Sequence, residues 1–120
     1  MAHQPTVLVV DDDAGIRKML IEVLKLEGIP VETAVNGREA LDMLVKSSPR
    51  VVLLDIGMPI MDGRQVMQAL EADPAQRARH RIILMSAWTS LEQNRDLEPD
   101  GKLVKPFTVD QLLNVLAPNE

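Results

Sequence analysis

The sequence contains no cysteine and no tyrosine, and its large aromatic side chains are limited to Trp88 and Phe107. The lack of cysteine excludes a disulfide framework, a thiol nucleophile and a cysteine metal site. The apolar runs are far too short to cross a membrane, and the amino terminus lacks the basic residues of a signal peptide. The net charge is −5 and no segment concentrates lysine and arginine, which argues against direct binding to nucleic acid. We therefore expect a cytoplasmic protein without membrane insertion.

The length of 120 residues suits a single domain that can bury a hydrophobic core. Hydrophobic residues make up 46% of the chain and charged residues 26%, which are ordinary values for a globular protein. The sequence has no internal repeats and no low-complexity tracts. We expect one domain over residues 1–120.

Short apolar runs alternate with helix-like segments along the chain, an order typical of βα repeats. A run of large apolar residues such as Val51–Leu54 is typical of a strand buried on both faces of a parallel sheet. The predicted strands cover residues 7–10, 31–34, 51–54, 82–85 and 103–104. The second strand follows Pro30 and the fifth is short, so both are expected at sheet edges. The sequence predicts an α/β fold: a doubly wound five-stranded parallel sheet of order 2-1-3-4-5, flavodoxin-like, with helices on both faces.

Helices are predicted between these strands from the spacing of apolar residues and from helix-ending residues. The first carries Ile16 and Leu20 and ends at Gly28. Further helices are expected around residues 40–44, over 65–72 up to a break at 73–74, and as a short segment over 91–97. Thr108 and Gln111 have the spacing of a capping box and predict the start of the last helix.

Polar side chains follow four of the predicted strands: Asp11–Asp13, Asp55, Ser86 and Lys105. Ligands of open parallel sheets bind beyond the carboxyl ends of the strands. Four parallel strands would therefore collect carboxylates, a hydroxyl and an ammonium at one edge, a set that can hold a divalent cation and a phosphoryl group. Aspartates before a helix can also be simple caps, and we assign Asp13 that role. Three adjacent acids exceed the needs of a cap and repel one another unless a cation is present.

Four motifs, in order and at suitable separations, resemble the receiver domain of bacterial two-component response regulators, of the single-domain CheY-like type. The matching stretches are residues 7–12, 53–63, 85–87 and 104–107. The resemblance covers essentially the whole chain. It implies that Asp55 is the phosphoacceptor and attacks the phosphohistidine of a sensor histidine kinase or a histidine phosphotransfer protein. Such a domain is a signalling switch rather than an enzyme, and its downstream target stays unknown.

The resemblance also implies the ligands of a Mg²⁺ ion. Asp12 and Asp55 would bind it directly, together with the backbone carbonyl of Gly57, and Asp11 would act through a metal-bound water. Oxygen ligands and retained waters suit Mg²⁺. Phosphoryl transfer depends mainly on positioning and on neutralising charge on the oxygens, so a cation supplies much of what the reaction needs.

Two further residues and a docking surface are implied by the same resemblance. Ser86 would donate a hydrogen bond to a phosphoryl oxygen, and Lys105, before a peptide bond that is usually cis, would pair with the phosphoryl group. The four-helix bundle of the partner would pack on the first helix and on the loop after the fifth strand. The matching residues are Gly15, Ile16, Met19, Pro106 and Phe107. Ile16 could instead face the core.

Three features depart from the usual receiver pattern. Lys102 stands where many receivers have an aromatic switch residue, so the usual readout is not expected. The segment between Ser86 and Lys105 is about one helical turn short, which predicts a short or irregular helix there. Trp88 is expected in a loop beside the site, either as a partly buried aromatic that covers the core or as a gate.

Other functions can be weighed against this interpretation. Phosphatases of the haloacid dehalogenase type need an aspartate two positions after the nucleophile, where this chain has Gly57, which cannot transfer a proton. A flavin-binding protein would need a Thr/Ser/Gly-rich phosphate loop and aromatic side chains around the ring, and here three aspartates occupy that loop. The serious alternative is a pseudo-receiver, a docking module of the same fold that works without phosphorylation.

Overall fold

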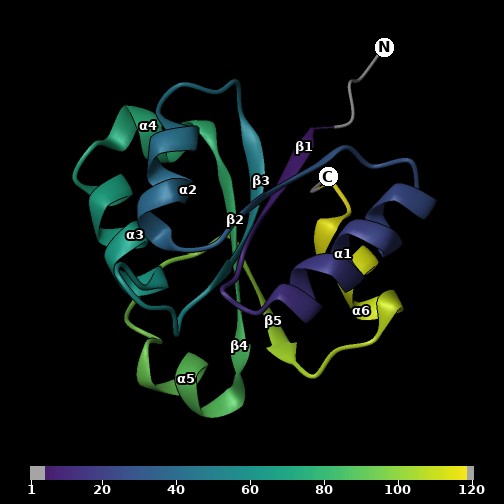
Figure 1. Ribbon diagram of the computed structural model, residues 1–120. Helices are drawn as coiled ribbons and strands as arrows, with labels where there is room; N and C mark the ends of the chain where they lie inside the picture. The colour runs from purple at the N-terminus through teal and green to yellow at the C-terminus, as the bar shows by residue number, and fades with distance from the viewer. Residues whose placement is uncertain (1–4, 119–120) are drawn as a thin grey trace.

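The computed structural model describes residues 5–118, and the first four and last two residues, included in the expected single domain, lie outside this description. A five-stranded parallel sheet of order β2-β1-β3-β4-β5 lies between two layers of helices (Figure 1). The predicted fold class, strand order and edge strands are confirmed. The elements are β1 (Thr6–Val10), α1 (Ala14–Leu26), β2 (Val31–Ala34), α2 (Gly37–Leu44), β3 (Arg50–Asp55), α3 (Gly63–Glu71), α4 (Pro74–Arg79), β4 (Arg81–Ala87), α5 (Trp88–Gln93), β5 (Gly101–Lys105) and α6 (Val109–Leu116).

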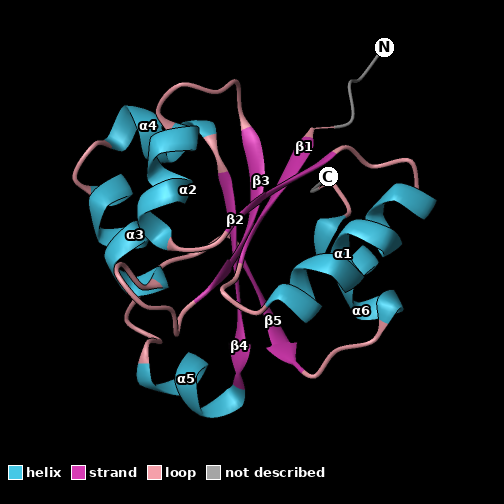
Figure 2. Ribbon diagram, viewed as in Figure 1, coloured by secondary structure: helices cyan, strands magenta, loops and turns pink. Residues whose placement is uncertain are grey.

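The central strands are apolar on both sides because both faces of the sheet are covered. Side chains alternate between the two faces of a strand, and in β1 the residues Val7 and Val9 pack towards α1 and α6, whereas Leu8 and Val10 pack towards α2 and α3. Figure 2 shows the two groups of helices on opposite sides of the strands. Within residues 5–118, no helix has the length and apolarity that a membrane crossing requires.

Helix ends follow the predicted signals. The Asp13 carboxylate accepts hydrogen bonds from two backbone N–H groups in the first turn of α1, so its predicted capping role is confirmed. Gly28 has a φ of +71° just after the end of this helix, a conformation that glycine adopts without steric cost. Thr108 and Gln111 form the predicted capping box of α6.

Two predicted boundaries were wrong, and one helix was missed. The predicted break at residues 73–74 is confirmed because α3 ends before Asp73, but the same pair also starts α4, since Asp73 caps this helix and proline suits a first helical position. The fifth strand runs over Gly101–Lys105 rather than 103–104, since an edge strand needs few apolar side chains. The short helix lies at Trp88–Gln93 rather than 91–97, so Trp88 begins a helix instead of lying in a loop.

The turn between β3 and α3 brings two backbone segments into contact at Gly63. The backbone N–H of Gly63 donates to the carbonyl of Ile56 at 2.9 Å. A Cβ added at Gly63 would lie 2.8 Å from Cα of Ile56 and would also overlap the carbonyl oxygen of Asp55. Gly57, at the start of the same turn, has open space in the direction of a Cβ. The turn therefore tolerates a side chain at one glycine and excludes it at the other.

We expect Gly63→Ala to lower the free energy of unfolding by about 1–3 kcal/mol, because the backbone around Asp55 must shift to admit the methyl group. Gly57→Ala is the matched control and should be neutral or raise stability by about 0.4–1 kcal/mol, since it restricts only the unfolded chain. Urea denaturation of both variants measures the difference. Equal stability of the two variants would contradict the close approach at Gly63.

His80 is buried at the junction of α4 and β4, at the end of the sheet opposite to Asp55. Its Nδ1 atom accepts a hydrogen bond from the backbone N–H of Arg50 at 3.1 Å, which fixes this nitrogen as unprotonated. Burial lowers the pKa of His80, and the charges of Arg79, Arg50 and Arg77 lower it further. The folded protein therefore holds His80 in its neutral form.

Because an unfolded chain protonates histidine near pH 6.5, the unfolded state takes up more protons than the folded state below that pH. The contribution of His80 to stability is complete above about pH 6.5 and decreases as the pH falls below it. We expect His80→Gln, which keeps an acceptor but does not titrate, to lose less stability than the wild type between about pH 7 and pH 5.5. Identical pH dependence in thermal unfolding of the two proteins would show that His80 is not held neutral.

Candidate functional site

Strand register and alternation bring three charged residues to one side of the sheet edge. Val10 pairs with Leu54, so Asp11 follows β1 at the level where Asp55 ends β3. Because side chains two positions apart point to the same face of a sheet, Asp11 lies on the face of Val9 and Asp55 on the face of Leu53. This face packs against α1 and α6. Lys105, two residues after Leu103 in β5, continues the same face. The predicted gathering of these side chains is confirmed by the geometry.

Lys105 connects two buried carboxylates. Its Nζ atom lies 2.7 Å from Oδ2 of Asp11 and 3.5 Å from Oδ1 of Asp55. Asp11 is 1% exposed and Asp55 is 6% exposed, so water solvates neither carboxylate freely. Among the described residues, the Lys105 ammonium is the only cationic group that forms an ion pair with either acid, and it lies closer to Asp11.

Asp55 is energetically costly to ionise in this position. Burial raises the pKa of Asp55, and the neighbouring Asp11 carboxylate raises it further, while Lys105 acts in the opposite direction. The site thus holds more negative charge than its one lysine compensates. A bound cation would favour the ionised, nucleophilic form of Asp55.

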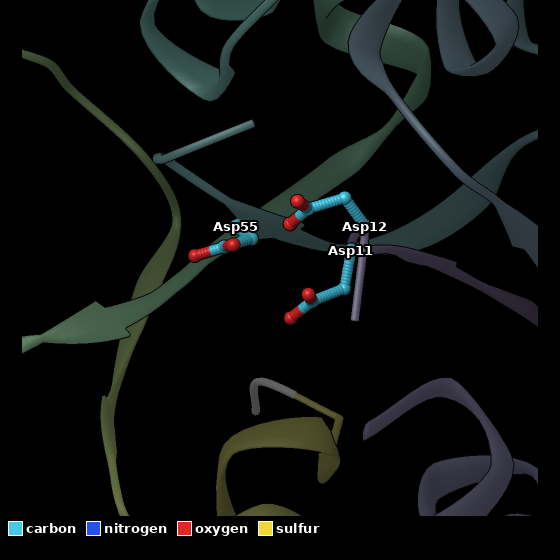
Figure 3. Close-up of side chains that lie close together, drawn as sticks. All are labelled: Asp11, Asp12 and Asp55. Atoms are coloured by element: carbon cyan, nitrogen blue, oxygen red, sulfur yellow. The ribbon is translucent and has the colours of Figure 1, made fainter. Parts of the chain in front are cut away.

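Asp12 completes a set of three carboxylates. One oxygen each from Asp11, Asp12 and Asp55 lie within 4.8 Å of one another (Figure 3). Unlike the other two, Asp12 is exposed, which leaves its carboxylate accessible from solvent. This all-oxygen arrangement suits a hard divalent cation that keeps several waters.

The remaining predicted site residues lie near the carboxyl ends of neighbouring strands. Ser86 is buried near the end of β4, one residue beyond the Met85 that pairs with Asp55. Gly57 is exposed just after β3. The Lys105–Pro106 peptide bond is cis, as the resemblance implied.

Four of the five predicted docking residues line one apolar groove beside the cluster. The groove has a volume of about 330 Å³ and is lined by Ile16, Met19, Lys105, Pro106 and Phe107. Ile16 packs partly against the core and also lines the groove, so both of its expected placements hold in part. Gly15 is exposed in the first turn of α1 but does not line the groove.

The segment after α5 is held by contacts that the sequence did not reveal. Arg64 in the first turn of α3 donates to both carboxylate oxygens of Asp96, at 2.9 and 2.6 Å, and to the side chain of Asn94. Arg77 in α4 donates to the carboxylate of Asp100 at 3.1 Å. These partners lie more than twenty residues apart in sequence, and no local pattern links them.

Two residues near the ends of β4 and β5, Trp88 and Lys102, are exposed. Trp88 is 62% exposed at the start of α5, so its interpretation as a partly buried aromatic that covers the core was wrong. Lys102 is exposed on β5, as expected for a charged side chain in place of an aromatic one. Leu91 and Leu97, which lie between these two residues in the sequence, are both buried.

Comparison with known proteins gives a consistent result. The sequence matches the family described as response regulator receiver domain over residues 7–117. Sporulation initiation phosphotransferase F of Bacillus subtilis is 36% identical over 109 residues, which cover 88% of this chain and 86% of that protein. The response regulator TrrA of Thermotoga maritima, in a crystal structure in complex with Mg²⁺-BeF, is 33% identical with a TM-score of 0.80; the match covers 92% of this chain and 94% of TrrA.

Other relatives are longer than this chain. The transcriptional regulatory protein PrrA of Mycobacterium tuberculosis is 38% identical over 112 residues, which are 91% of this chain but 47% of PrrA. The chain thus spans about half the length of that relative. The family match covers nearly every described residue and includes the acidic cluster, Ser86 and Lys105. This chain belongs to the receiver domains of two-component response regulators.

Proposed function

We propose that Asp55 accepts a phosphoryl group from a phosphohistidine of a sensor histidine kinase or a histidine phosphotransfer protein, in the cytoplasm. The observation that carries this proposal is the surroundings of the buried Asp55 carboxylate. Its Oδ1 atom lies 3.5 Å from Nζ of Lys105, and one of its oxygens lies within 4.8 Å of oxygens of Asp11 and Asp12, close enough for one cation to contact all three. A bond forms between an Asp55 oxygen and phosphorus while the phosphorus–nitrogen bond of the donor breaks and its electron pair returns to the imidazole. The protein is the substrate of its own reaction and is not an enzyme in the strict sense.

Asp12, Asp55 and the carbonyl of Gly57 are the residues that would hold Mg²⁺ directly, with Asp11 acting through water. Their oxygen atoms suit this ion, and the TrrA structure with Mg²⁺-BeF is a related precedent. Bound Mg²⁺ would supply charge neutralisation at the phosphoryl oxygens. Lys105 would move its ion pair from the carboxylates towards the phosphoryl group, and Ser86 would donate a hydrogen bond to it.

The pseudo-receiver alternative has no observation in its favour among the described residues. A domain that had lost phosphorylation would not need to retain an acidic cluster and its lysine at a cost in mutual repulsion. Lys102 departs from the usual switch pattern but lies outside this cluster. Phosphorylation itself distinguishes the two functions.

Incubation with acetyl phosphate and Mg²⁺ should add one phosphoryl group to the protein, because the nucleophile and its neutralising groups are already assembled. Intact mass spectrometry measures the adduct, which should disappear with EDTA and be absent from Asp55→Asn. An unmodified mass in the wild type with every small phosphodonor would instead favour the pseudo-receiver.

The groove defined by Ile16, Met19, Lys105, Pro106 and Phe107 is the surface on which we expect the donor to dock. It lies directly beside the acidic cluster, because Lys105 lines the groove and also pairs with Asp55 in the cluster. An apolar contact there would hold the donor histidine in line with Asp55 and exclude water from the reaction. Met19 is 39% exposed, which makes it the clearest probe of this contact.

Met19→Lys should slow phosphoryl transfer from a protein donor about tenfold or more by placing a charge in the docking contact, and should leave labelling by acetyl phosphate unchanged. Leu26→Lys is the matched control, since Leu26 is 87% exposed on the same helix and does not line the groove. A loss with both donors would indicate misfolding, and unchanged transfer from the protein donor would place docking elsewhere.

The segment from Ser86 to Gly101 is the element that we expect to report phosphorylation. Ser86 begins it one residue beyond the Met85 that pairs with Asp55, and α5 contains only six residues and lacks a side-chain cap. Its later part depends on Arg64–Asp96 and Arg77–Asp100. The Arg64–Asp96 pair is largely exposed, and exposed ion pairs contribute little to stability, so a new hydrogen bond from Ser86 can shift the part of the segment that this pair holds.

Trp88 fluorescence should therefore change when Mg²⁺ and beryllofluoride occupy Asp55, and the change should be much smaller in Ser86→Ala. Trp88 is the single tryptophan of the chain, so the signal reports this segment alone. If emission and amide exchange across residues 86–101 stay constant at full occupancy of Asp55, then this segment is not the switch.

A further inference from the structure

Asp11 is held at each of its polar groups by a different partner. Its backbone N–H donates to the carbonyl of Ala34 at 3.2 Å. One carboxylate oxygen accepts the backbone N–H of Asp13 at 2.9 Å and the other accepts Lys105 at 2.7 Å. Its backbone carbonyl accepts Nη1 of Arg17 at 2.8 Å. The first three contacts join Asp11 to β2, to the backbone of Asp13 and to Lys105, and the contact with Arg17 adds a link to α1.

The contact with Arg17 controls the orientation of one peptide plane. The Asp11 carbonyl belongs to the peptide group that links Asp11 to Asp12, so its direction determines where the Asp12 side chain begins. Asp11 is buried, and a buried carbonyl without a donor is unfavourable. Arg17 reaches this carbonyl from α1, six residues further along the chain. The guanidinium therefore ties the acidic loop to the first helix.

Asp12 itself has no comparable support. It is exposed, and its carboxylate takes part in none of the hydrogen bonds or ion pairs found among residues 5–118. Its approach to Asp11 and Asp55 therefore depends on the backbone before it, which Arg17 holds, and on the cap at Asp13 behind it. The direction of the Asp12 carboxylate therefore depends on the contacts that hold the backbone on either side of it.

We propose that Arg17 is a positioning residue for the cation site: its hydrogen bond to the Asp11 carbonyl orients the Asp11–Asp12 peptide so that both carboxylates face the same ion. The proposal rests on the Mg²⁺ site of the proposed function. It has a competing effect of opposite sign, because a guanidinium also repels a nearby cation. Positioning makes Arg17 strengthen Mg²⁺ binding, whereas charge alone makes it weaken Mg²⁺ binding.

Calorimetric titration of the full chain with Mg²⁺ separates the two effects. Arg17→Met should bind Mg²⁺ about tenfold more weakly than the wild type, the loss typical when a contact that orients a metal ligand is removed. Lys18→Met is the matched control: it removes the same charge from the next residue of α1, which is exposed and has no hydrogen bond or ion pair within residues 5–118. This control should bind Mg²⁺ as tightly as the wild type or slightly more tightly.

A second readout does not use the metal. Amide exchange at Asp13, whose N–H donates to the Asp11 carboxylate, should accelerate in metal-free Arg17→Met and not in Lys18→Met. If Arg17→Met fails to fold, Arg17→Gln takes its place with the same expectations, because glutamine is too short to reach the carbonyl. Arg17→Met binding Mg²⁺ as tightly as Lys18→Met would overturn the positioning role and leave the proposed function intact. Failure of the wild type to bind Mg²⁺ would overturn both.

Discussion

The structure depends on holding three carboxylates together against their mutual repulsion. Asp11, Asp12 and Asp55 offer oxygens within 4.8 Å of one another, and within residues 5–118 Lys105 is the cation found paired with the buried members. Such a cluster does not assemble by itself, since each acid favours water and distance from the others. Burial of the apolar strands supplies the opposing free energy: β1, β3 and β4 are apolar on both faces, so the core fixes the strand ends regardless of what they carry.

The two ends of the sheet differ in how their polar groups are arranged. At the carboxyl end, the strands bring buried carboxylates together, and burial first and the Asp11 charge second raise the pKa of Asp55. At the amino end, Nδ1 of His80 accepts a hydrogen bond from the backbone of Arg50 and Arg77 donates to Asp100 before β5, while the buried Nε2 of His80 and Nε of Arg81 have no hydrogen-bond partner among the described residues. The carboxyl end of the sheet is thus electrostatically unfavourable without a cation.

Sequence patterns predicted the central architecture because it is encoded locally. The runs at 51–54 and 82–85 are typical of strands buried on two faces. Asp55 and Ser86 directly follow these two runs, and Lys105 follows the apolar residues of the edge strand β5. The family resemblance then supplied the expected roles of these residues, and it implied the cis bond before Pro106 that the structure contains. The fold and the gathering of Asp11, Asp55 and Lys105 at one edge of the sheet were therefore accessible from sequence.

Contacts between distant side chains were not accessible. Asp73-Pro74 was interpreted as a break, although the same pair also starts α4, and the choice depends on where the chain goes next. The salt bridge from Arg64 to Asp96 and the hydrogen bond from Arg17 to the Asp11 carbonyl have no periodic signature, because each depends on how two elements are packed. The positions of exposed residues such as Trp88 were equally hard to predict, because their side chains are not fixed by packing in the core.

The most direct test of this account is a high-resolution crystal structure of the protein with Mg²⁺ and beryllofluoride. The account predicts an octahedral cation that touches Asp12, Asp55 and the Gly57 carbonyl, with beryllofluoride on Asp55 and the Lys105 ammonium moved from Asp11 to the fluoride atoms. A cation bound elsewhere, or Lys105 still paired with Asp11 in a fully occupied site, would contradict the claim that these strand ends form one phosphoryl-accepting centre.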